Sequence, residues 1–116
     1  MSAIARAYSV FGALACGVSV ALGAYASHVA QAQDGKRLAI AALFAFAHGL
    51  ALIVLCSRPS RTAAWAMFCF ALGIVLFSGS LASAVFFGAS TAMAPFGGSL
   101  LMLGWGILTV DFIRAG

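Results

Sequence analysis

The sequence predicts an all-α membrane protein, a four-transmembrane-helix bundle whose antiparallel helices run alternately up and down. Two thirds of the 116 residues are hydrophobic (65%) and only 7% are charged. The charges fall in short clusters, and the uncharged stretches between them reach or exceed the length needed to span a bilayer, about 20 apolar residues. The connections are short, so consecutive helices should be antiparallel neighbours within a single domain.

The positions of the charges and turn signals place the four spans in order. Charge clusters bound the first two. The uncharged stretch after Arg61 is too long for one span, and the polar, turn-prone segment 89–95 divides it into two. At about 1.5 Å per residue each span approaches or exceeds the roughly 30 Å of hydrocarbon. The predicted spans are residues 8–29, 38–56, 63–88 and 95–113.

The first span also has features of a secretory signal peptide. Arg6 precedes an apolar run that leads to the small-x-small triplet Ala24-Tyr25-Ala26. The apolar character continues beyond that triplet, so we expect the segment to be retained as a membrane span.

The basic residues predict that both termini are cytoplasmic, because short loops rich in lysine and arginine tend to stay inside. This orientation leaves only Lys36 and Arg37 outside, close to Asp34. The net charge of +4 then reflects membrane topology. We expect no nucleic-acid partner, because the basic residues do not cluster on one water-exposed surface. The arginines placed inside are Arg6, Arg58, Arg61 and Arg114.

Cysteine usage predicts neither a disulfide framework nor a metal site. Cys16, Cys56 and Cys69 all fall within predicted spans, and their number is odd. No two of them stand at metal-ligand spacing.

Small residues at helical spacing predict how the helices pack, because they let backbones approach closely in lipid. In the first span one face carries Ala13, Gly17, Ala21, Ala24 and His28; in the fourth, Gly97, Gly104 and Asp111 recur every seven residues. The glycines expected to pack helices together are Gly17, Gly73, Gly79 and Gly104.

Polar residues inside the spans form the candidate site, because a polar group in hydrocarbon is costly without a partner. By helical rise, His48 and Ser78 should share one layer, with Ser80 slightly further out. His28 should lie near the start of the fourth span, where Gly97 and Gly98 leave backbone N–H groups uncovered. The indole N–H of Trp105 needs a partner in the bundle. Asp111 is expected to pair with Arg114, Arg6, Arg58 or Arg61.

Four segments resemble the signature stretches of the domain of unknown function family 423. They are Gly23-Ala24-Tyr25-Ala26-Ser27-His28, Phe44-Ala45-Phe46-Ala47-His48, the string from Leu72 to Leu81 that contains Leu-Phe-Ser-Gly-Ser-Leu, and Ala94-Pro95-Phe96-Gly97-Gly98 followed by Leu103-Gly104-Trp105. The resemblance implies a small four-helix protein of the bacterial inner membrane, in a family that is itself largely uncharacterised.

Two function classes remain open. The first is a structural or accessory protein that packs in the membrane against lipids, itself or a larger complex. The second handles a small molecule, lipid or ion through His48, Ser78 and Ser80. Catalysis is not expected, because the sequence assembles no nucleophile with a base and no carboxylate pair. No cofactor is expected either: His28 and His48 differ in depth by roughly 13 Å on the helical rise, too far for bis-histidine haem ligation.

Overall fold

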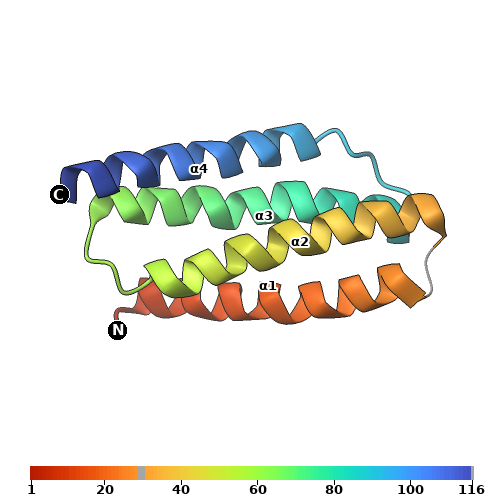
Figure 1. Ribbon diagram of the computed structural model, residues 1–116, viewed down its shortest axis with the longest axis horizontal. Coiled ribbons are helices and arrows are strands. Elements are labelled where there is room, and N and C mark those ends of the chain that lie inside the picture. The colour runs from red at the N-terminus through yellow and green to blue at the C-terminus, as the bar shows by residue number, and fades with distance from the viewer. Residues whose placement is uncertain (29–30, 116) are drawn as a thin grey trace.

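The computed structural model describes residues 1–28 and 31–115, and this part of the chain forms four helices. They are α1 (Ala3–His28), α2 (Ala32–Leu55), α3 (Arg61–Phe87) and α4 (Ala94–Ala115). Each is long and apolar enough to cross a membrane. The helices run alternately up and down, which brings both chain ends to the same end of the molecule (Figure 1). The predicted all-α, four-span fold is confirmed.

All four helices begin earlier than the sequence predicted, α3 and α4 by one or two residues and the first two by more. α1 begins at Ala3 rather than residue 8, and α2 at Ala32 rather than Leu38. The prediction began each span after its charged cluster, but a helix needs only continuous backbone hydrogen bonds and extends into water beyond its apolar part. In α2, Asp34 lies in the first turn, where a carboxylate interacts favourably with the helix dipole. Residue 29, the predicted end of the first span, lies outside the described residues.

Local signals fix both ends of α3. The Ser60 hydroxyl caps its start by accepting a hydrogen bond from the Ala63 N–H at 3.2 Å. At the other end Gly88 adopts a φ of 67°, the left-handed conformation in which helices commonly stop. The helix therefore ends at Phe87, and Gly88, its predicted last residue, is the C-cap.

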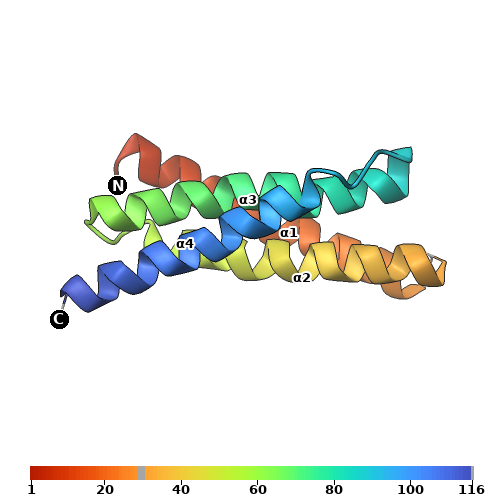
Figure 2. The ribbon, with the colours of Figure 1, turned by 90° about the horizontal axis from the view of Figure 1, so that it is seen from above.

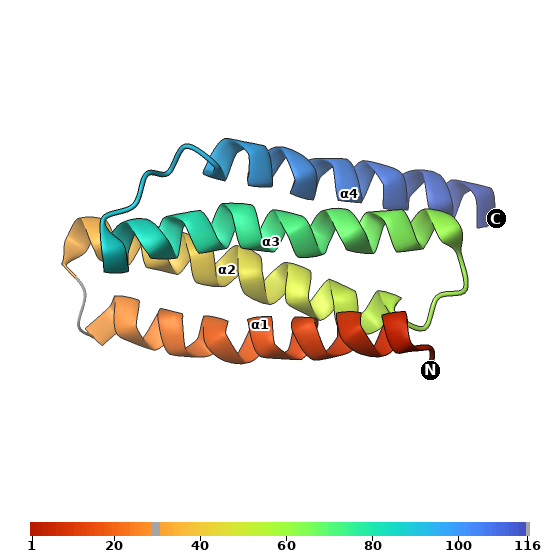
Figure 3. The same cartoon turned by 180° about the vertical axis from the view of Figure 1, so that it is seen from behind.

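The helices pack in chain order, and the bundle is open rather than closed into a ring. α1 packs on α2, α2 on α3, and α3 on α4, whereas α1 makes only a small contact with α3. Within the described residues α4 brings no backbone close to α1 or α2. Figure 3 shows this succession from behind, and Figure 2 shows α4 crossing obliquely over α3. Side chains alone must then link α2 to α4.

Glycines mark the two closest helix crossings. Between α1 and α2, a Cβ on Gly12 would lie 2.5 Å from the Gly49 carbonyl oxygen. Between α3 and α4, a Cβ on Gly97 would lie 2.7 Å from the Leu76 carbonyl carbon. Neither crossing leaves room for a methyl group.

The expected packing glycines divide into two pairs. Gly73 and Gly104 lie in the α3–α4 contact, against Leu101 and Phe70 respectively. The expectation for Gly17 and Gly79 is corrected, because a Cβ on either would meet nothing within 4 Å.

The face predicted to pack α1 onto its neighbours points outward instead. Its members Ala13, Gly17, Ala21, Ala24 and His28 are all exposed. The buried residues of α1 are Gly12 and Ser19. They lie on a second face of small residues, and this face contacts α2 at Gly12.

Candidate intramembrane polar site

His48 is the most deeply placed titratable side chain of the predicted site, and the fold buries it between three helices. It lies on α2 and is 4% exposed. Phe70 of α3 packs edge-on against its ring, with centroids 5.2 Å apart, and Phe44, one turn earlier on α2, stacks beside it at 6.0 Å. Trp105 of α4 lies at 5.8 Å. Aromatic rings thus surround the imidazole and separate it from water.

Both ring nitrogens of His48 have partners. Nδ1 lies 2.7 Å from the Phe44 carbonyl oxygen, and the Trp105 indole Nε1–H donates to Nε2 at 2.9 Å. A carbonyl only accepts, so the proton must sit on Nδ1, and Nε2 must be bare to accept from the indole. The two bonds together are satisfied only by the neutral Nδ1–H tautomer. The bond to Trp105 is also the link between α2 and α4 that the backbone does not make.

Ser78 makes a separate link, between α3 and α2. Its hydroxyl donates to the Ala41 carbonyl oxygen at 2.7 Å and is buried. His48 follows Ala41 by seven residues, about 10 Å of helical rise. The predicted shared layer of His48 and Ser78 is therefore wrong. The prediction takes residue 38, the start of the predicted span, as the outer end of this helix. Because α2 begins at Ala32, that reference level is about 9 Å too deep.

Ser80 and His28 lie away from His48. The Ser80 hydroxyl donates to the Ser90 carbonyl oxygen at 3.4 Å, so it ties the end of α3 to the following loop. His28 is exposed in the last turn of α1. Neither residue shares a hydrogen bond with His48, and the structure does not gather the predicted residues into one cluster.

The start of α4 differs from the expectation of uncovered backbone donors. The Gly97 N–H donates to the Met93 carbonyl oxygen at 3.0 Å, and Gly97 is buried against the backbone of Phe77. Gly98 lies beside it, where an added Cβ would be 3.6 Å from the Phe77 ring. Both glycines therefore serve the α3–α4 contact, and Gly97 offers no free N–H to a ligand.

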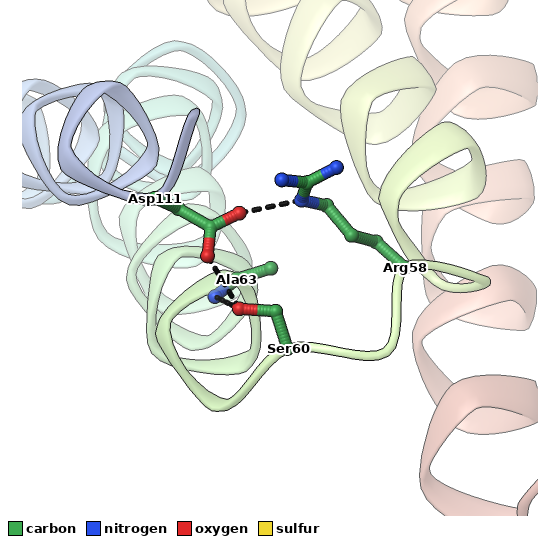
Figure 4. Close-up of polar contacts among 4 residues, drawn as sticks. All are labelled: Arg58, Ser60, Ala63 and Asp111. Carbon is green, nitrogen blue, oxygen red and sulfur yellow. Dashed lines mark hydrogen bonds and ion pairs between the residues drawn. The ribbon is translucent and has the colours of Figure 1, made fainter. Parts of the chain in front are cut away.

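A third polar link lies at the end of the molecule that carries both termini. Asp111 of α4 is 6% exposed, and the Arg58 Nε donates to its Oδ2 at 2.5 Å. The Ser60 hydroxyl donates to the other carboxylate oxygen. Figure 4 shows this carboxylate held between the α2–α3 loop and the N-terminus of α3. Of the four expected arginine partners, the structure selects Arg58.

Comparison with known proteins decides the family. The family model described as "Protein of unknown function (DUF423)" matches residues 22–98. The chain belongs to the DUF423 family. It is similar to a "UPF0382 membrane protein" in each of two Staphylococcus epidermidis strains, at 31% identity over 122 residues, covering 94% of this chain and 97% of each relative. No solved structure matches. Four apolar spans and relatives named as membrane proteins establish this DUF423 chain as a membrane protein.

The family match covers His48 and Ser78 but ends before Trp105 and Asp111. Sequence reasoning foresaw that Trp105 needs a partner and that His48 needs one, but not that the two residues meet. Their separation of 57 positions gives no local signal. Gly12, Cys16 and Ser19 are spaced by four and three residues, a spacing that indicates a helix-packing face. The face through Gly17, Ala21 and Ala24 has the same spacing, so the sequence does not tell which of the two faces contacts α2.

The arrangement uses its buried polar groups for links between and within helices. The part of the DUF423 protein that the structure describes has four buried polar side chains. His48, Ser78 and Asp111 each join separate elements, while Ser19 donates to the Cys16 carbonyl oxygen of its own helix at 2.7 Å. In residues 1–28 and 31–115 no three His, Cys, Asp or Glu side chains come together as metal ligands.

Proposed function

We propose that this DUF423 protein is a non-enzymatic accessory protein of the bacterial inner membrane, which packs against itself or a larger membrane complex with both termini in the cytoplasm. The observation that carries the proposal is the double hydrogen bonding of His48. A histidine that moves protons must exchange a proton at one nitrogen, and both nitrogens here hold partners supplied by the chain.

The other predicted polar residues support the same reading. The Ser78 hydroxyl is committed to a backbone carbonyl, so it joins helices and does not line a path next to His48. In a bilayer such bonds replace the water that the polar groups lack. These residues therefore act by holding α2, α3 and α4 in one arrangement.

The distribution of basic residues supports the proposed orientation. Four arginines, at positions 6, 58, 61 and 114, lie at the end where both termini meet, while Lys36 and Arg37 lie in the first turns of α2 at the other end. The end richer in basic residues is the one that normally stays in the cytoplasm.

Replacing His48 by leucine tests the function. We expect wild type and His48→Leu to be recovered from membranes in the same assembly, measured by native mass spectrometry, with the variant destabilised by about 1 kcal/mol, as for other intramembrane hydrogen bonds. Proteoliposomes of either protein, loaded with a pH-sensitive dye, should take up protons no faster than empty liposomes.

The matched control is Phe46→Leu, an aromatic-to-leucine change at an exposed position of the same helix. A wild-type protein that is monomeric and partner-free in native membranes would contradict the accessory role. Proton flux that disappears in His48→Leu and persists in Phe46→Leu would establish the ion-handling alternative instead.

A further inference from the structure

The open side of the bundle carries an apolar groove between α2 and α4. It has a volume of about 330 Å³ and is lined by Ala47, Leu50 and Val54 on α2 and by Trp105, Leu108 and Phe112 on α4. The groove exists because these two helices meet through side chains only. The lining extends from Ala47 to Leu55 on α2 and from Trp105 to Phe112 on α4, so the groove runs for about 10–12 Å along the helices. Its shape and lining suit a hydrocarbon chain.

A cation stands at one end of this groove. The Arg58 guanidinium carbon lies 4.6 Å from the centroid of the Phe112 ring, which belongs to the groove wall. The bond to Asp111 fixes the guanidinium through its Nε alone. Among the described residues neither terminal nitrogen of Arg58 has a hydrogen-bond partner, and in Figure 4 the bond to Asp111 starts at Nε and not at either of them.

A polar hollow adjoins the same guanidinium. It has a volume of about 410 Å³, and its lining includes Arg58, Thr62 and Arg114 together with Asp111. Among its described lining residues the two arginines outnumber the one carboxylate, and that carboxylate already accepts from Arg58 and Ser60. These side chains give the hollow a net positive charge and open donors at the end of the transmembrane helices, the level at which lipid headgroups lie.

From this juxtaposition we propose that the α2–α4 face binds one anionic phospholipid. The phosphate accepts hydrogen bonds from the terminal nitrogens of Arg58 and from Arg114, and an acyl chain lies in the groove between Leu50 and Trp105. Guanidinium groups are well suited to phosphate because their planar N–H donors match its oxygens. A free phosphate would satisfy the hollow but leave the groove unused. The proposal does not depend on the accessory role proposed above.

Lipid retention measures this directly. The protein is purified in mild detergent, mixed with equal amounts of dioleoyl phosphatidylglycerol and dioleoyl phosphatidylcholine, and analysed by native mass spectrometry. We expect one tightly retained phosphatidylglycerol. Arg114→Gln should weaken its retention about fivefold, the equivalent of about 1 kcal/mol for one basic residue at an anionic membrane surface. Arg58→Lys keeps the charge but loses the planar donors, and should weaken retention as well.

Two controls separate the site from general surface charge and surface bulk. Arg61→Gln removes the same charge from the same end of the molecule, but Arg61 does not line the hollow. Ala47→Phe fills the groove, whereas Ala21→Phe adds the same ring to an exposed position of α1 outside it. Retention should fall in Ala47→Phe and remain at the wild-type level in Arg61→Gln and Ala21→Phe.

Three results would overturn the proposal. Equal retention of the two lipids would show that the headgroup charge is not recognised. An equal loss in Arg61→Gln and Arg114→Gln would assign the effect to overall charge. Displacement of phosphatidylglycerol by millimolar inorganic phosphate, with Ala47→Phe behaving as wild type, would show a free-phosphate site without a chain in the groove.

Discussion

Replacing Gly97 by alanine tests the closest contact of the fold. A Cβ at this position would overlap the Phe77 backbone nitrogen and would lie 2.7 Å from the Leu76 carbonyl carbon. Ordinary contacts begin near 3.4 Å, so α4 must move away from α3 by more than about 0.7 Å. The obstacles are backbone atoms, which cannot rotate aside as a side chain would.

The cost follows from the contacts that such a movement weakens. A gap of 0.5–1 Å forfeits about a quarter to a half of the dispersion energy of each atom pair across it. The α4 face that would lose contact includes Leu101 and Leu108, both 4% exposed. Overpacking of this kind typically costs about 1–3 kcal/mol, and we expect Gly97→Ala to lower the free energy of unfolding by an amount in that range relative to its control.

The control is Gly106→Ala in the same helix. A Cβ there meets nothing within 4 Å, so the substitution changes helix propensity by the same amount, about 1 kcal/mol, without a steric effect. Reversible unfolding of both variants by sodium dodecyl sulfate in mixed micelles gives the difference. Equal unfolding midpoints for the two variants would refute the reasoning, because they would show that α3 and α4 are not in backbone contact at Gly97.

Three further predictions concern the polar links and the topology. Trp105→Phe should cost about 0.6–1.7 kcal/mol, and a double-mutant cycle with His48→Phe should recover that energy as coupling; additive effects would mean the bond is absent. Asp111→Asn should lower the unfolding midpoint, because it weakens the bond to Arg58, and an unchanged midpoint would show that Asp111 is merely solvated. In a variant whose three native cysteines are replaced by alanine, single cysteines in place of Lys36 and Arg58 should be labelled by an impermeant maleimide from opposite sides of the membrane; labelling from one side would contradict the up-down arrangement.

The number of helices and their alternating up-down arrangement could be predicted because both follow from the local composition of spans and short connections. Charge clusters and apolar length are properties of neighbouring residues, and the bilayer thickness converts them into spans. The same dependence on composition made the predicted helix starts wrong. Apolar length reports where the hydrocarbon begins, whereas α2 starts earlier, at Ala32, with Asp34 in its first turn.

The partners of the polar residues could not be predicted because they depend on helix rotation and offset. Both residues offered the right chemistry, because the Trp105 indole needed an acceptor and His48 needed a donor. Which residues meet, however, changes completely when a helix turns by a quarter or slides by one turn. The two runs of small residues on α1 illustrate this, since the one through Gly12 faces α2 and the one through Gly17 faces outward.

The contact pattern has a consequence for biosynthesis. α1 with α2 and α3 with α4 each form a helical hairpin whose own contact depends on closely approaching glycines. The links from Ser78 to Ala41 and from Trp105 to His48 both cross from one hairpin to the other. During synthesis the first hairpin can therefore enter the bilayer and close before the second exists. His48 then has its Phe44 bond but no partner at Nε2 until α4 is synthesised and brings Trp105 beside it.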